Sequence, residues 1–127
     1  MTQPTIRLLL LLQAAVFIAA ALAHLGVLVG GYAHLKAGIA EGVIGSVLLA
    51  SLVFTLLRPA LANAIAVAAQ SFAVLGTAVG LFTTAIGVGP RTVLDLIFHA
   101  GMVVALVTGL VATTKSARMH ASADRRA

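Results

Sequence analysis

The sequence predicts an all-α integral membrane protein in which four transmembrane helices form an up-down-up-down bundle. Composition is the first reason: 61% of the 127 residues are hydrophobic and 9% are charged, whereas soluble domains carry about 25% charged residues. The second reason is that the chain divides into four apolar segments, each close to the ~20 residues that a helix needs to cross a membrane. The third is that the connections are short, which favours antiparallel neighbours.

The four helices are expected at about residues 6–29, 37–57, 60–86 and 92–113. The first segment opens with a basic residue and an apolar run, as a cleavable signal peptide does. Its apolar run is longer than the ~7–15 residues of a signal-peptide core. Apolar residues also continue beyond the Ala21-Leu22-Ala23 tripeptide through Val29. We therefore predict a first spanning helix here.

Glycine and proline mark the boundaries of the other helices. Residues 30–33, which include two glycines, precede the second helix, and residues 87–90 precede the fourth. Pro59 and Pro90 stand near the starts of the third and fourth helices, where a missing backbone N–H has no cost. Because no linker separates the segments, residues 1–127 are predicted to form one transmembrane domain.

Basic residues at the ends of the segments predict the orientation. Six of the 8 lysines and arginines fall on one side of the membrane: Arg7, Arg58, Lys115, Arg118, Arg125 and Arg126. Lys36 and Arg91 fall on the other side. Because cytoplasmic segments carry the excess of Lys and Arg, both termini and the basic tail at 115–127 are predicted to be cytoplasmic. This tail accounts for the net charge of +5, so the charge indicates no nucleic-acid partner.

Five ionisable residues within or beside the apolar segments are the candidate functional residues: His24, His34, Glu41, Asp95 and His99. Counting 1.5 Å of rise per residue places all of them near the extracytoplasmic face. Ionisable groups at membrane depth are costly and therefore indicate a functional site. The third helix contributes none of them, so the pocket is expected to be lined mainly by the first, second and fourth helices.

Simple structural roles for the same residues are equally consistent with the pattern. Glu41 with His24, or Asp95 with His99, would satisfy each other's hydrogen-bonding groups. Arg91 precedes Asp95 by four residues, which allows an ion pair if both lie in one helix. Whether the protein is an enzyme stays open, because none of these roles requires catalysis.

Three kinds of ligand are consistent with the residues of this pocket. A transition metal would use His24, His34, Glu41, Asp95 and His99, since imidazole and carboxylate are common metal ligands. A b-type haem would use His24 and His99 as axial ligands. A quinone or similar small polar headgroup would accept or donate hydrogen bonds at the same histidines and carboxylates.

Two other functions compete with ligand binding. A non-catalytic accessory or assembly subunit would dock its apolar surface onto a larger membrane complex. A small transporter or channel is the other alternative. Proton-coupled transport requires a titratable group near the bilayer centre, where this sequence has only neutral polar residues such as Ser46 and Gln70.

Small residues spaced by four predict close helix packing. The pairs are Gly26 with Gly30, Gly38 with Gly42, Gly76 with Gly80 and Ala64 with Ala68. Such spacing lets helices approach closely, either within the chain or across a homodimer. Gln13 and Gln70 lie deeper than the ionisable residues and are expected to form hydrogen bonds between helices.

The stretch Gly87-Val88-Gly89-Pro90-Arg91-Thr92-Val93, followed by Asp95 and His99 and preceded by Ala40-Glu41-Gly42, resembles uncharacterised small four-helix proteins of the bacterial inner membrane. The resemblance covers most of the chain. It implies the four-helix fold and a multi-pass protein of the bacterial inner (plasma) membrane, and it implies no activity, substrate or cofactor.

Overall fold

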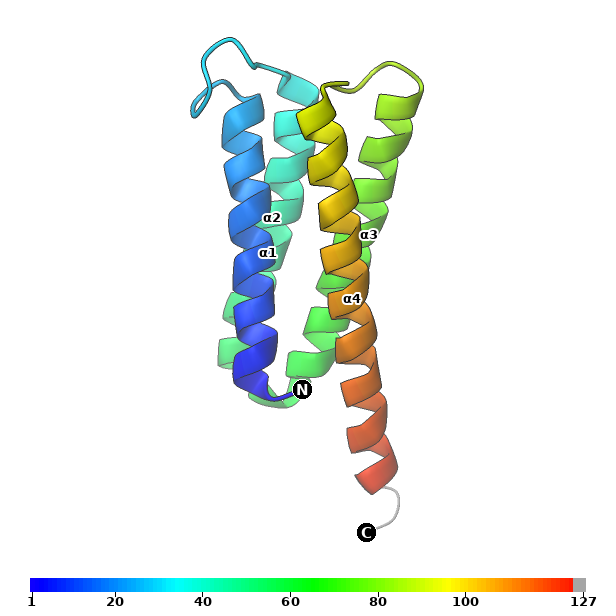
Figure 1. Cartoon of the computed structure of the whole chain (residues 1–127). Helices are drawn as coiled ribbons and strands as arrows, with labels where there is room; N and C mark the ends of the chain where they lie inside the picture. The colour runs from blue at the N-terminus through cyan, green and yellow to red at the C-terminus, as the bar shows by residue number, and fades with distance from the viewer. Residues whose placement is uncertain (125–127) are drawn as a thin grey trace.

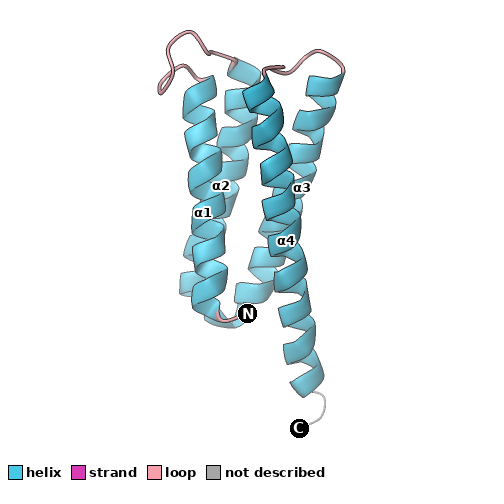
Figure 2. Cartoon of the chain, in the orientation of Figure 1, coloured by secondary structure: helices cyan, strands magenta, loops and turns pink. Residues whose placement is uncertain are grey.

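The computed structural model describes residues 1–124 and is all-helical in that range, as Figure 2 shows. Its elements are α1 (Gln3–His24), α2 (Leu35–Leu57), the 3-10 turn η1 (Pro59–Leu61), α3 (Ala62–Ala85) and α4 (Val93–Asp124) (Figure 1). All four α-helices are long and apolar enough to cross a membrane. The prediction of an all-α protein with four helices of spanning length is therefore confirmed. Arg125 and Arg126 of the predicted tail lie outside the described residues.

The two ends of the bundle contain different segments of the chain (Figure 1). The loops at residues 25–34 and 86–92 lie together at one end, where the Tyr32 hydroxyl is 2.8 Å from Thr92 Oγ1. The N-terminus and η1 lie at the other end, where Gln3 Nε2 donates to the Pro59 carbonyl oxygen at 3.1 Å. We call these the loop end and the N-terminal end.

Helix α1 ends at His24, five residues earlier than the apolar pattern predicted. The Leu25 N–H bonds to the Ala21 carbonyl and the Gly26 N–H to the Ala23 carbonyl, which closes the last turn. Gly26 has a φ of +75°, a left-handed conformation that is costly for residues with a Cβ and common just after helix ends. Hydrophobicity alone did not reveal this stop. The chain then folds back, and the His34 N–H reaches the His24 carbonyl at 2.6 Å.

Helix α4 continues to Asp124, well beyond the predicted end at residue 113. No glycine or proline follows Gly109 in the described chain, so no residue there interrupts the helix. The first part of the predicted basic tail is therefore a helical extension of α4, which projects past the N-terminal end (Figure 1).

Glycines bring α1 and α2 into close contact within the chain. A Cβ atom at Gly45 would lie 2.8 Å from Ile18 Cγ1 and 3.2 Å from the Ile18 backbone nitrogen. A Cβ at Gly38 would lie 2.9 Å from Leu25 Cγ. Side chains at these positions would force the helices apart. The glycine spacing in α2 thus serves packing against α1.

Several polar side chains are buried together with the apolar core, and many large apolar side chains lie on the outside of the bundle. Gln13 Nε2 on α1 lies 3.4 Å from Gln70 Oε1 on α3, and Gln70 Nε2 donates to Thr113 Oγ1 on α4 at 3.1 Å. These are hydrogen bonds between helices, as the sequence predicted. On the outside, Leu75 is 68% exposed and Val104 is 67% exposed. Such a surface matches a lipid bilayer as the surrounding solvent.

Candidate functional site

His24 lies between two carboxylates contributed by two other helices. It ends α1 at the loop end and is 3% exposed. Its Nδ1 is 2.7 Å from Glu41 Oε2 on α2, and its Nε2 is 3.1 Å from Asp95 Oδ1 on α4. We call these three residues the His24 cluster. It joins three helices through one imidazole ring.

Helix direction explains why these side chains meet at the loop end. His24 is in the last turn of α1 and Asp95 is in the first turn of α4. A cation is favoured near a helix C-terminus and an anion near a helix N-terminus, because of the helix dipole. With both carboxylates ionised, His24 donates from both ring nitrogens and is the cation that they share. The three groups then carry a net charge of −1.

Two neutral residues of the loops hold Asp95 in place. Thr92 precedes α4, and its backbone N–H and hydroxyl both donate to Asp95 Oδ2, while the Asp95 N–H donates back to Thr92 Oγ1. This reciprocal arrangement is a capping box. Tyr32 donates its hydroxyl to Asp95 Oδ1 and stacks on His24, with ring centroids 5.4 Å apart and planes inclined by 24°. Both loops therefore support the cluster.

The Tyr32 contact gives a pH prediction. Burial, followed by the hydrogen bond to the Asp95 carboxylate, raises the pKa of the Tyr32 phenol above its ordinary value of 10.0. The folded protein thus keeps the phenolic proton to a higher pH than the unfolded chain. The stability gained is fully present below pH 10 and is lost as the pH rises through the raised pKa.

Ultraviolet absorbance of tyrosinate measures this shift directly, because the chain has one tyrosine and no tryptophan. The folded protein in detergent is expected to titrate at higher pH than the same protein unfolded in SDS and urea. Coincident titration curves would contradict the contact between Tyr32 and Asp95.

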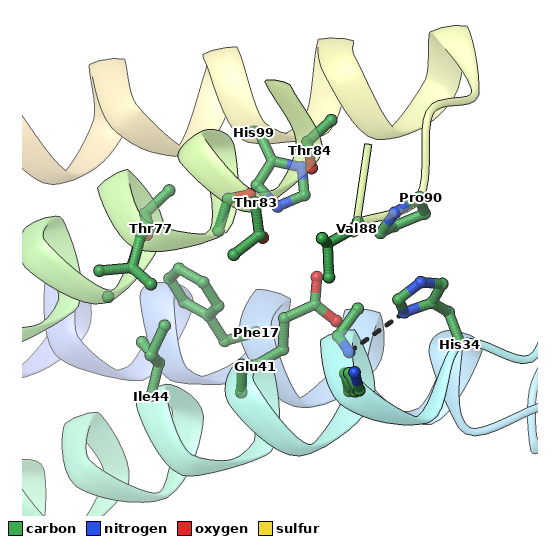
Figure 3. Close-up of a pocket in the computed structure, with 17 residues that line it drawn as sticks. Phe17, His34, Glu41, Ile44, Thr77, Thr83, Thr84, Val88, Pro90 and His99 are labelled. Atoms are coloured by element: carbon green, nitrogen blue, oxygen red, sulfur yellow. Dashed lines mark hydrogen bonds between the residues drawn. The ribbon is translucent and has the colours of Figure 1, made fainter. Parts of the chain in front are cut away.

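A cavity of about 160 Å³ lies beside the His24 cluster. Residues of α2 and α3 form most of its wall, and α4 and α1 contribute His99 and Phe17. Figure 3 shows Phe17 and Ile44 toward the middle of the bundle and His34 and Pro90 toward the loops. The predicted lining by the first, second and fourth helices is therefore wrong. Helix α3 lines the cavity with glycines and threonines, which carry no charge and so escaped a search for ionisable residues.

Two polar atoms on opposite walls of the cavity (Figure 3) have no hydrogen-bond partner among residues 1–124. Glu41 Oε1 is buried and unpartnered, although Oε2 of the same carboxylate contacts His24. His99 uses Nδ1 to donate to the Asp95 carbonyl oxygen at 2.7 Å, which leaves Nε2 available. In Figure 3, Glu41 and His99 point toward the same space from opposite walls. Thr84 Oγ1, also in the wall, is buried without a partner as well.

The structure brings some of the five predicted residues together and separates others. His24, Glu41 and Asp95 are in direct contact, and His99 contacts the Asp95 backbone one turn deeper. His34 has a different role: its Nδ1 accepts from the Ala37 N–H at 3.3 Å and caps the start of α2. It lines the cavity without bonding to the cluster.

The expected ion pair between Arg91 and Asp95 is not formed. Helix α4 begins at Val93, so Arg91 lies in the loop and the spacing of four does not place it on a shared helical face. Its guanidinium instead donates to the Thr84 and Ala85 carbonyl oxygens at 2.8 and 2.6 Å. These carbonyls belong to the end of α3, where cations are favourable.

Four residues of the site were missed by the sequence analysis: Tyr32, Gly80, Thr84 and Thr92. The Thr92-x-x-Asp95 spacing before an apolar run is a recognisable capping signal. Tyr32 and Gly80 gave no comparable signal, because Tyr32 bonds to Asp95 and Gly80 lies next to His99, both on a distant helix of the chain, α4.

In this arrangement a metal or haem iron would have to displace a carboxylate from His24. Within residues 1–124, no group of three or more His, Cys, Asp or Glu side chains is placed to hold a metal ion. An axial or metal-binding imidazole needs one ring nitrogen free of a proton. Both ring nitrogens of His24 face carboxylates, so the pair His24 and His99 does not fit a haem iron in this arrangement.

The loop end thus combines a buried charged cluster with an adjacent, mostly apolar cavity. Comparison with protein-family models, with curated proteins and with solved structures finds no match to the chain.

Proposed function

We propose that the cavity binds one small amphipathic ligand with a ring-sized polar headgroup, of the quinone type. The observation that carries this proposal is the pair of unpartnered polar atoms, Glu41 Oε1 and His99 Nε2, at one apolar cavity. Apolar pockets with a few convergent polar groups are the usual form of small-molecule sites. A dry apolar cavity of ~150 Å³ holds benzene, and this cavity has about 160 Å³. A single six-membered ring therefore suits its size.

The same proposal includes the orientation of the protein in its membrane. The chain crosses a bacterial inner membrane four times in up-down-up-down order, with both termini and the basic tail in the cytoplasm. Arg7, Arg58 and Lys115 support this, because they lie toward the N-terminal end and cytoplasmic segments are rich in basic residues. The loop end and the cavity then lie near the extracytoplasmic face.

The ligand enters from the lipid. Ala40 on α2 and Val79 on α3 both line the cavity and are exposed on the outside of the bundle. An opening between these helices admits an amphipathic molecule already dissolved in the bilayer. Its headgroup then reaches Glu41 and His99, while an apolar tail stays among the lipids.

Binding of tetramethylbenzoquinone and of tetramethylhydroquinone to the purified protein in lipid nanodiscs tests the function. Gly80→Ala is the informative variant, because the new Cβ would lie 3.6 Å from His99 Nε2, an ordinary contact that disturbs no backbone. The methyl group occupies space that the headgroup would fill beside Nε2. We expect it to weaken binding about tenfold, because a ring that matches the size of the cavity has to shift to avoid it.

Gly101→Ala is the matched control, since a Cβ there meets no atom within 4 Å. It should bind both ligands as the unaltered protein does. Absence of saturable binding of both ligands, or equal affinity of the Gly80 and Gly101 variants, would contradict the assignment of the cavity.

The other candidates give different outcomes in the same preparation. Haem b on His24 and His99 would give a Soret band, and a transition metal at the five ionisable residues would appear in elemental analysis. Either one requires His24 to release a carboxylate, which is why the quinone-type ligand is preferred. Purification as a homodimer or within a larger complex would favour an accessory role, and proton-coupled flux in liposomes would favour transport.

A further inference from the structure

The two unpartnered atoms at the cavity have the same hydrogen-bonding character. His99 Nδ1 lies 2.7 Å from the Asp95 carbonyl oxygen. A carbonyl oxygen only accepts, so the proton of this bond is on Nδ1. In the neutral imidazole the other nitrogen, Nε2, is then an acceptor. The His99 side chain therefore presents an acceptor to the cavity.

Glu41 presents a second acceptor from the opposite wall. With the carboxylate ionised, its Oε2 accepts from His24 Nδ1, which lies 2.7 Å away, and its Oε1 is buried without a partner. An ionised carboxylate has only acceptor sites. A buried acceptor that stays unpaired costs free energy, which a ligand that donates to it recovers.

The wall has further polar groups: the threonine hydroxyls, and, at the start of α2, His34 and the exposed Lys36 ammonium, which is a donor. Thr83 already donates its hydroxyl to the Gly80 carbonyl oxygen at 2.8 Å. Thr84 Oγ1 is buried without a partner and is able to donate or accept. Besides His34 and Lys36, two acceptors and one adaptable hydroxyl therefore surround the headgroup.

We propose that the cavity selects a neutral headgroup that donates two hydrogen bonds, and so binds the hydroquinone form of its ligand in preference to the quinone form. This inference rests on the proposed function and adds the oxidation state. A quinone has two carbonyl acceptors, which would face the acceptors of Glu41 and His99. A hydroquinone has two hydroxyl donors. A neutral headgroup is favoured over an ammonium because His24 already pairs with Glu41, and the Lys36 ammonium lines the cavity.

The test compares ligands of one shape on the unaltered protein in nanodiscs, without oxygen. The ligands are tetramethylhydroquinone, its monomethyl ether, its dimethyl ether and tetramethylbenzoquinone. Affinity is measured by equilibrium dialysis and corrected for partition into protein-free nanodiscs. We expect the hydroquinone to bind at least about tenfold more tightly than the quinone, because a hydrogen bond to a charged group is worth that factor or more. The monomethyl ether should lie between the hydroquinone and the dimethyl ether.

A His99→Leu variant distinguishes the contribution of His99 to hydroquinone binding from that of Glu41. The ratio of its affinity for the hydroquinone to its affinity for the quinone should be about tenfold lower than in the unaltered protein, because one acceptor for a hydroxyl is lost. Quinone binding equal to or tighter than hydroquinone binding in the unaltered protein would overturn the inference and leave the ligand site in place. Failure of all four ligands to bind would overturn the proposed function and the inference together.

Discussion

Replacing His24 with leucine is expected to lower the free energy of unfolding by about 3–5 kcal/mol, the usual cost of removing one partner from a buried ion pair. Leucine roughly keeps the volume of the imidazole but leaves the Glu41 and Asp95 carboxylates without their shared cation. Both carboxylates are almost fully buried, with 5% and 3% of their side chains exposed. Unfolding of the purified protein by SDS in mixed micelles measures the loss.

Two further variants identify the cause of this loss. Adding Glu41→Gln and Asp95→Asn to His24→Leu removes both uncompensated charges and should restore much of the stability. His34→Asn is the control histidine variant, since asparagine is a good N-cap and should preserve the start of α2. If His24→Leu unfolds at the same SDS fraction as the unaltered protein, the cluster does not hold the three helices together.

Replacing Gly45 with alanine is expected to lower the free energy of unfolding by about 1–3 kcal/mol, the range for overpacking a tight interface. The new Cβ would lie 2.8 Å from Ile18 Cγ1, 3.2 Å from the Ile18 backbone nitrogen and 3.3 Å from Phe17 Cβ. Because backbone and Cβ atoms cannot rotate away, α1 and α2 must separate. The same unfolding measurement detects the loss.

The control for this variant is again Gly101→Ala, where a Cβ meets open space. It should be neutral or slightly stabilising, because alanine favours helix more than glycine by about 0.5–1 kcal/mol. Equal stabilities of the two variants would mean that α1 and α2 are not in close contact at Gly45.

Composition and segment length were sufficient to predict four helices, because the requirement for about 20 apolar residues does not depend on tertiary contacts. The ends of α1 and α4 were harder to predict from the sequence. Gly26 stops α1 through its backbone conformation within a run that is still apolar, and α4 continues because nothing stops it. Helix ends depend on local backbone geometry, to which hydropathy is insensitive.

The candidate site was predicted in part. Depth counting grouped His24, Glu41 and Asp95 correctly, since each lies within about two turns of a helix end at the same side of the bundle. It did not predict that His24 would use both nitrogens on carboxylates. A pocket was predicted at this end of the bundle, but its wall on α3 was not, because that wall is made by Gly76, Gly80 and threonines. A glycine leaves a cavity only where the neighbouring helix does not fill the space, and the sequence does not show which helix is the neighbour.

The position of Tyr32 bears on whether the affinity of the proposed ligand is calculated from its concentration in water or in the bilayer. Its ring covers His24, and its hydroxyl joins the two loops through Thr92 and Asp95. If the proposed ligand exchanges with the bilayer between α2 and α3, its concentration in the bilayer is the one that determines binding. Each CH₂ added to a ligand's tail increases its partition into lipid by about 0.8 kcal/mol. The apparent affinity calculated from the ligand concentration in water then rises with tail length, although the ligand makes no additional contact with the protein.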